Sequence, residues 1–192
     1  MDVIEAIKSR RSVRKYQKKQ IPLDYLKTVI NAGLSAPNAG GRQGSIIAGI
    51  HNIEITEKIG KLNIAKFDRS TLVGGHVSDE QPSIIDDPSI KSGFYGAPSV
   101  CIVFGPVNFL YSVPDAFCCA MNMTLAAESL GLSSCIIARG EETFDNPEGQ
   151  KFLEEWEIPQ EYTARCFVLL GYIEGPEPSR KTLHEGRFRI IE

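Results

Sequence analysis

The chain has 192 residues, of which 42% are hydrophobic and 23% charged, as in an ordinary soluble domain that can bury its own core. Its formal net charge of −3 argues against a nucleic-acid partner held by bulk charge. No apolar run approaches the roughly 20 residues that a bilayer requires, and the first residues lack a signal-peptide pattern, so we expect a cytoplasmic protein with no membrane partner.

The N-terminal half is predicted to contain three helices and one strand. Asp2 can cap a first helix that ends near Ser9, with Glu5 as its capping-box partner. Pro22 suits the start of a second helix, which Pro37 ends. A loop at 38–44, a strand at 45–50 and a short helix at 55–62 follow.

Residues 67–94 form a long polar stretch that contains Gly74-Gly75 and two prolines. Loops of this length in a compact domain usually carry function or are disordered. We therefore expect a lid or loop, and His76 within it is a candidate for contact with a substrate.

The C-terminal half is predicted to contain three strands and two helices. A helix over 114–131 is apolar nearly all round, which places it in a core or an interface. The strands are expected at 98–105, 134–138 and 166–172, and the second helix starts at Asn146-Pro147. Because strands and helices interleave, the fold class is α/β or α+β, with a sheet between helices.

The five cysteines and three histidines are scattered, and no Cys-x-x-Cys pair occurs. These spacings predict no metal site. Four of the cysteines lie among apolar residues, where Cys acts as a small hydrophobic side chain. The vicinal pair Cys118-Cys119 stays open as a redox candidate.

The common catalytic motifs are absent. The sequence has no dinucleotide fingerprint, Walker loop, nucleophile elbow or His-Glu-x-x-His. Nothing suggests a side-chain nucleophile with a placed base. If the protein is an enzyme, we expect a bound cofactor to supply the chemistry, with no catalytic side chain.

The main positive feature is the basic run Arg10-Arg11-Ser12-Val13-Arg14 at the end of the first helix. Guanidinium groups bind phosphate bidentately and keep their charge when partly buried. In an extended segment, Arg10, Ser12 and Arg14 share one face. From the residues alone, a phosphate site and a solvated basic turn both remain open.

This run, followed by Tyr16, resembles the opening signature of the nitroreductase family. Further landmarks of that family occur in the same order along the chain. They are Ala36-Pro37-Asn38, Gln43, Gly96-Ala97-Pro98, the helix over 115–131, Gly171-Tyr172 and Pro178-Ser179-Arg180-Lys181. The resemblance spans nearly the whole chain, so we expect one FMN-binding domain over 1–192 in which 67–94 is the lid or loop of the substrate pocket.

The resemblance implies an α+β fold, with a central, mostly antiparallel sheet wrapped by helices, and a homodimer. It implies an FMN-dependent oxidoreductase that transfers hydride from NADH or NADPH to a small acceptor such as a nitroaromatic or a quinone. It does not choose between the two nicotinamides. A 2′-phosphate would need a basic site, for which Arg42, Lys66 and Arg69 are candidates.

The resemblance also carries FMN-binding residues over by position: Arg10, Arg11, Ser12, Arg14, Pro37, Asn38, Ala39, Gln43, Ile137, Ala138, Arg139 and Arg180. The residues at 10–12 would hold the phosphate and ribityl chain, Arg14 the pyrimidine edge, and Arg180 the phosphate from the tail. The loop at 37–39 would reach the flavin from the partner subunit. The backbone at 137–139 would lie near the reactive flavin nitrogen.

The chain departs from the family in one loop, which is commonly Pro-Ser-Ser-x-Asn-x-Gln-Pro-Trp. Pro37 and Gln43 remain, whereas the other positions differ, and this predicts a roomier pocket. Two alternatives share the cofactor: a specialised flavoprotein of the same fold, dehalogenase-like or flavin-degrading, and a non-catalytic FMN-binding protein. A third is a domain without flavin, in which the arginines are only surface.

Overall fold

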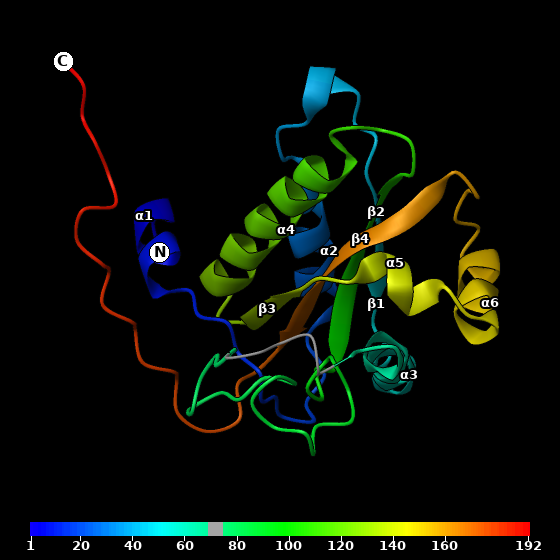
Figure 1. Cartoon of the computed structure of the whole chain (residues 1–192), viewed down its shortest axis with the longest axis horizontal. Helices are drawn as coiled ribbons and strands as arrows, with labels where there is room; N and C mark the ends of the chain where they lie inside the picture. Colours follow the sequence, from blue (N-terminus) through cyan, green and yellow to red (C-terminus); the bar gives the residue numbers. More distant parts are fainter. Residues whose placement is uncertain (69–74) are drawn as a thin grey trace.

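The computed structural model describes residues 1–68 and 75–192. Its centre is a four-stranded sheet, in which the spatial order is β1-β2-β4-β3 and every neighbouring pair is antiparallel (Figure 1). The strands are β1 (Ile46–Ile50), β2 (Ser99–Pro106), β3 (Ser133–Ile137) and β4 (Tyr162–Gly171). The expected α+β fold with an antiparallel sheet is confirmed.

Helices cover both faces of the sheet (Figure 1). One buried cluster joins the sheet to α2 (Leu23–Leu34) and α4 (Ser112–Ser129). The other cluster lies on the opposite face, with α3 (Ile53–Ala65) and α5 (Gly140–Phe144) packed there and α6 (Pro147–Glu155) beside them. Strands β2 and β4 are buried on both faces, which explains their continuous apolar sequence.

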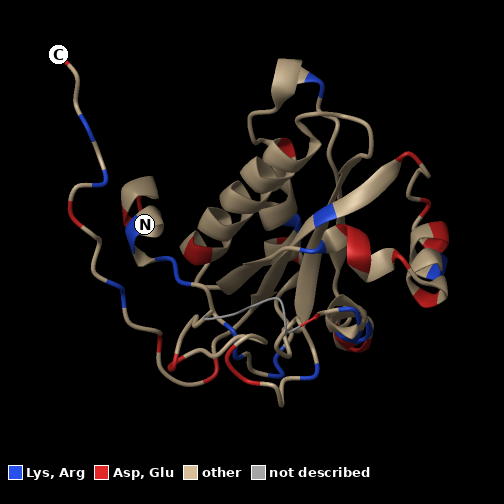
Figure 2. Ribbon diagram, in the orientation of Figure 1, with Lys and Arg blue, Asp and Glu red and all other residues tan. Residues whose placement is uncertain are grey.

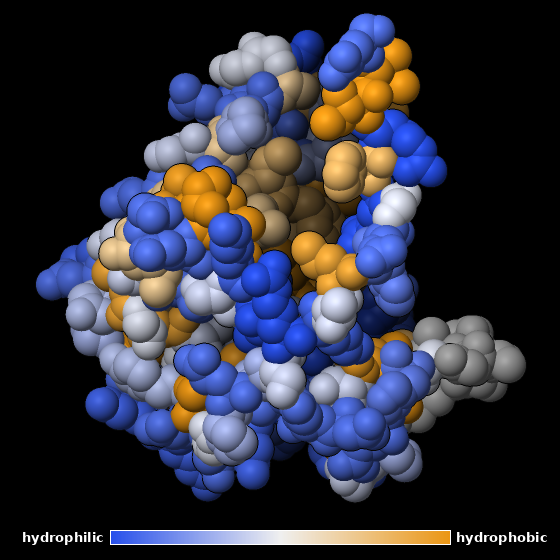
Figure 3. All heavy atoms as spheres, turned by 90° about the vertical axis from the view of Figure 1, so that its left-hand side faces the viewer, coloured by the Kyte–Doolittle hydropathy of each residue, from blue (hydrophilic) through white to orange (hydrophobic). Residues whose placement is uncertain are grey.

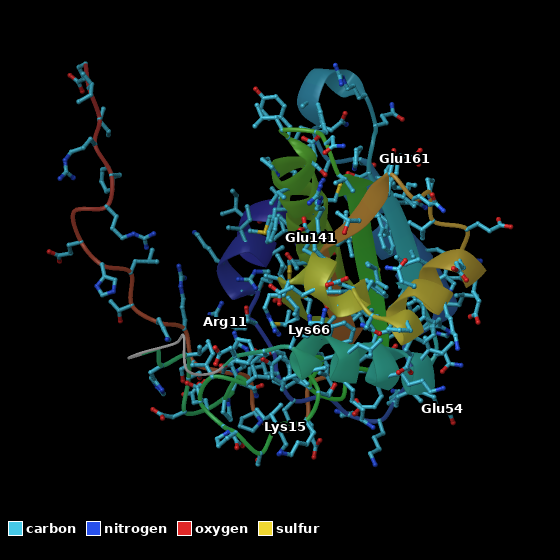
Figure 4. The ribbon with its side chains drawn as sticks, turned by 45° about the vertical axis from the view of Figure 1, so that its right-hand side comes forward. Arg11, Lys15, Glu54, Lys66, Glu141 and Glu161 are labelled. Carbon is cyan, nitrogen blue, oxygen red and sulfur yellow. The ribbon has the colours of Figure 1, made fainter. Side chains whose placement is uncertain are left out.

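A β-bulge interrupts β4 at Arg165, where the pairing with β2 shifts between Val103 and Phe104. The Arg165 guanidinium bonds Ser112 Oγ at 2.9 Å and forms a salt bridge with Glu141. Ser112 begins α4, and Glu141 lies in α5 (Figure 4). The bulge therefore ties the sheet to one helix on each of its faces.

Most of the predicted elements are present, with shifted ends. Helix α1 (Val3–Ser9) has the expected capping box between Asp2 and Glu5. Strand β4 begins at Tyr162, earlier than the predicted Cys166, because the residues before the bulge also pair with β2. The short helix α5 was not predicted.

The chain ends in an extended tail after β4 (red in Figure 1), which runs past α1. The tail exposes large apolar side chains: Leu183, Phe188, Ile190 and Ile191. Among the described residues, no helix is long and apolar enough to cross a membrane.

Candidate functional site

The basic run lies along the free edge of β3. Ser12 bridges Ser134 in a parallel pair, and the Val13 N–H donates to the Ser134 carbonyl at 3.0 Å. Val13 is buried in the core, whereas Arg10, Ser12 and Arg14 line a cavity on the other side. The segment is thus extended, and its alternation places the polar side chains on one face, as the pattern predicted.

This first cavity has a volume of about 600 Å³ and is strongly basic. Six Lys and Arg side chains line it, against two carboxylates: Lys8, Arg10, Arg11, Arg14, Arg180 and Lys181, with Asp79 and Glu80. Figure 2 shows the basic residues that follow α1, beside an α4 that carries charge only near its ends. Such a cavity attracts a phosphate or another anion.

Arg11 differs from its neighbours, because its Nη1 group closes the end of α1 (Figure 4). This group donates to the carbonyls of Lys8, Ser9 and Arg10 at 2.8, 2.6 and 3.0 Å. A cation at this helix end satisfies free carbonyls and complements the helix dipole. The buried Nε of Arg11 has no hydrogen-bond partner among the described residues.

Residues 76–86 form the second wall of the cavity, and Asp86 organises them. The Asp86 carboxylate accepts the N–H groups of Val77 at 2.7 Å and Ser83 at 2.8 Å. Burial would raise the pKa of Asp86, but these backbone hydrogen bonds lower it to about 2. His76, which lines the cavity, lies 3.2 Å from the same carboxylate through Nδ1.

This wall is joined to the basic run through Gln81. The Arg14 N–H donates to Gln81 Oε1 at 2.7 Å, and Gln81 is buried. Sequence reasoning gave no role to Gln81 or Asp86, because their contacts are made by side chains in a stretch without periodicity. Part of the expected lid, including Arg69 and Gly74, lies outside the described residues.

The tail forms the third wall and brings Arg180 to the cavity. The Ser179 N–H donates to a Glu80 carboxylate oxygen at 2.6 Å, and the Lys181 ammonium donates to the Val77 carbonyl at 2.9 Å. The hydrogen bond from Ser179 lowers the pKa of Glu80. Arg180, distant in sequence, therefore lies in the same cavity as Arg10.

A second cavity of about 210 Å³ shares Arg14 with the first and extends to the end of β3. Ile137, Ala138 and Arg139 line it, as does the buried Cys135. Burial raises the pKa of the Cys135 thiol, although the charge of Arg14 opposes this. Two of the three predicted groups, the basic run and the 137–139 turn, thus meet at Arg14.

The third predicted group lies elsewhere in the chain. The loop that contains Pro37 and Asn38 leads into a short 3-10 helix, η1 (Ala39–Gly41), near the start of α4, where the Ala39 N–H donates to Asp115 Oδ1 at 3.0 Å. Gln43 follows with a positive φ, and its N–H donates to Asn38 Oδ1. None of these residues lines the first or second cavity.

Two candidates for a 2′-phosphate site are occupied by other contacts. Lys66 donates to the carboxylate of Asp145 at 2.8 Å, and Arg42 lies over the ring of Phe109. All five cysteines are free thiols, and four of them are buried. Within the described residues, no group of His, Cys, Asp and Glu side chains forms a candidate metal site.

The fold and the cavity together define a class: an α+β protein with a basic cavity at the edge of an antiparallel sheet. The nitroreductase family model matches residues 7–172, so the chain belongs to the nitroreductase family. This finding confirms the resemblance to the nitroreductase family that the basic run and the later motifs indicated.

Individual relatives agree with this assignment. The chain is 29% identical over 176 residues to a protein of Methanothermobacter thermautotrophicus named "Putative NADH dehydrogenase/NAD(P)H nitroreductase", covering 90% of this chain and 78% of that one. The structure of a Bacteroides fragilis nitroreductase with bound FMN matches with a TM-score of 0.81 and 31% identity over the whole of both chains. A Desulfitobacterium hafniense nitroreductase with bound FMN shares the fold, with a TM-score of 0.79 and 20% identity over the whole of both chains.

Proposed function

We propose that this protein is an FMN-dependent oxidoreductase that transfers hydride from NADH or NADPH to a small acceptor. The observation that carries the proposal is the first cavity, in which Arg10, Ser12 and Arg180 converge from the two ends of the chain. The relative named as an NAD(P)H nitroreductase and the neighbour with bound FMN support the cofactor and the co-substrate.

The residues present fit FMN. A phosphate group needs several donors with fixed positive charge, which Arg10 and Arg180 supply, and the Ser12 hydroxyl suits the ribityl chain. The buried Nε of Arg11 is a further donor that lacks a protein partner among the described residues. When bound, FMN supplies the two-electron chemistry, which agrees with the lack of a side-chain nucleophile.

Arg14 and the turn at 137–139 act on the other end of the cofactor in this proposal. Both line the second cavity, which adjoins the first at Arg14, so they would face the ring end of a flavin whose phosphate lay at Arg10, at the point where the two cavities meet. Arg14 holds a fixed positive charge beside the pyrimidine edge, where it favours the reduced state by preorganised electrostatics. Val77, Ser83, Ile84 and Ile85 also line the second cavity.

We also propose that the working form is a homodimer. Pro37, Asn38, Ala39 and Gln43 lie near the start of α4, and the basic run lies beyond its other end. The 18 residues of α4 span about 27 Å at the usual rise of an α-helix, so the loop is remote from the cavity of its own chain. A two-fold dimer with antiparallel α4 helices would bring each loop to the partner's cavity.

An exposed apolar stripe supports this dimer. Val113, Phe117 and Met121 recur every four residues on α4, and the last two are 38% and 47% exposed. Figure 3 shows apolar side chains around a hollow on the face that carries α1 and the tail. Contiguous exposed apolar surface of this kind marks an interface.

The phosphate site is tested by comparing FMN with riboflavin, which lacks the phosphate. We expect the flavin-free protein to bind FMN at least about tenfold more tightly than riboflavin, because charge-assisted hydrogen bonds contribute about 1.5–3 kcal/mol each. Arg10→Ala should lose most of this preference while riboflavin affinity stays constant. Quenching of flavin fluorescence measures both affinities.

Lys151→Ala is the matched control, since it removes one positive charge from the exposed surface of α6. It should bind both flavins like the wild type. Equal FMN affinity in the wild type and in Arg10→Ala would contradict the proposal that the first cavity binds the FMN phosphate.

A further inference from the structure

Arg139 has a strained backbone, and the neighbouring residue fixes it. Its φ of 62° and ψ of 39° lie in the left-handed region, which costs a residue other than glycine free energy. The next residue, Gly140, packs so closely on the Ala164 carbonyl that a Cβ there would overlap it. The turn after β3 is therefore held rigidly, and it directs the Arg139 side chain into the second cavity.

Two contacts hold the Arg139 guanidinium from behind. Its Nη2 group donates to Asn63 Oδ1 at 2.9 Å, and its Cζ atom lies over the ring of Phe67, 4.4 Å from the centroid. Asn63 is buried and is itself fixed, since its amide donates to Thr143 Oγ1 at 2.9 Å. These contacts leave the side chain little freedom.

The other edge of the guanidinium has no partner. Nη1 of Arg139 is buried without a hydrogen bond to any described residue, and a buried charged donor without an acceptor is costly. Burial lowers the pKa of Arg139, and the nearby charge of Glu142 opposes this. Arg139 thus differs from Arg165, whose guanidinium has a carboxylate partner.

The lining of the second cavity suits an anion on an apolar body. Among its described lining residues, Arg14 and Arg139 are cations and none is Asp or Glu. Phe67, Ile84 and Ile85 supply apolar walls. The volume of about 210 Å³ is below the roughly 300–1,000 Å³ of pockets for drug-sized ligands, so a single ring with small substituents fits.

We propose that Arg139 is a specificity-determining residue, which binds a carboxylate on a small, one-ring acceptor through its unpaired Nη1 edge. A guanidinium held from behind accepts a carboxylate with little loss of side-chain entropy. The ring then packs on Ile84 and Ile85. This inference rests on the proposed function, because the turn at 137–139 is where that proposal puts the reactive part of the flavin.

The test compares benzoate with benzamide, which has nearly the same shape and no charge. Isothermal titration of the purified protein, with its flavin as isolated, should show benzoate binding at least about tenfold more tightly. Arg139→Met should remove this difference and leave benzamide affinity unchanged. Met and Arg both carry a Cβ, so both meet the same backbone strain at this position.

Two further variants sharpen the result. Arg139→Lys keeps the charge and should retain part of the preference for benzoate, whereas Lys151→Met removes a charge from α6 and should retain all of it. Equal affinities for benzoate and benzamide in the wild type would overturn the proposal. So would a preference that persists in Arg139→Met.

Turnover gives a second readout of the same idea. The ratio of kcat/KM for 4-nitrobenzoate to that for 4-nitrobenzamide should fall at least about tenfold in Arg139→Met. The fall should come from a higher KM for 4-nitrobenzoate. A protein that takes up no flavin or reduces no acceptor contradicts the proposed function, whereas the binding preference of Arg139 is still read by titration. The two failures are therefore distinguishable.

Discussion

Neighbouring arginines at the basic run have different environments. Arg10, Arg11 and Arg14 all line the first cavity, and Arg11 in addition closes α1 through three carbonyls. The alternation of an extended strand explains why 10, 12 and 14 share a face. The sequence therefore predicts which side chains converge, but the capping role of Arg11 depends on where α1 ends, and sequence patterns place helix ends poorly.

Gly140 is the residue on which the turn after β3 depends most directly. Gly140→Ala would drive a Cβ into the Ala164 backbone, which cannot move without disturbing β4. Overpacking of this kind costs about 1–3 kcal/mol, so we expect a lower midpoint of urea unfolding. Gly44→Ala is the control, because a Cβ there meets no atom within 4 Å. Equal midpoints for the two variants would argue against a rigid turn.

At the level of elements, the Asp86 carboxylate organises the wall over 76–86. Asp86 has a folded-state pKa of about 2, below the value of about 3.9 in an unfolded chain. A depressed pKa contributes stability that is complete above the unfolded value and is lost as the pH falls through the folded value. This contribution of Asp86 therefore persists at pH 4 and is largely gone below pH 2.

This pH dependence predicts how the wall opens. Pepsin should cut between Val77 and Ile85 slowly at pH 4 and much faster at pH 2 in the wild type. Asp86→Asn should be cut quickly at both values, because an amide cannot supply the negative charge that the N–H groups of Val77 and Ser83 stabilise. Asp79→Asn, at an exposed side chain, should behave like the wild type. Slow cutting of Asp86→Asn at pH 4 would contradict the role of Asp86.

Local signals explain which elements were predictable. The Asp2–Glu5 capping box and Asn146-Pro147 both start helices where the sequence indicates. The start of β4 was placed too late, because the bulge at Arg165 breaks the alternation. Helix α5 is too short for any period to show. The cavity wall depends on contacts between distant polar side chains, which no local pattern encodes.

At the scale of the whole molecule, the separation of the two predicted flavin-binding groups is the main feature. The loop near Asn38 and the turn near Arg139 lie at different ends of the fold, although the family resemblance assigns both to one site. If the proposed assignment holds, a single chain carries two half-sites. The exposed stripe on α4 gives the surface through which two chains could complete them.

This arrangement predicts that assembly and flavin binding fail together. Met121→Lys puts a charge into the stripe, so sedimentation should give the 21.2 kDa mass of one chain in place of twice that value. FMN affinity should fall in the same variant, although residue 121 does not line the first or second cavity. Glu154→Lys, on exposed α6, is the control and should leave both properties unchanged. A wild type that sediments as one chain while binding FMN tightly would contradict the dimer.

The absorption spectrum of the purified protein, before and after NADH or NADPH is added without oxygen, tests the central claim most directly. The proposed function predicts a flavin band that bleaches on addition of the nicotinamide, since the band reports the oxidised cofactor. A flavin band that does not bleach would instead indicate an FMN carrier without turnover. A colourless protein that takes up no FMN would contradict the assignment of the cavity at Arg10 and Arg14 altogether.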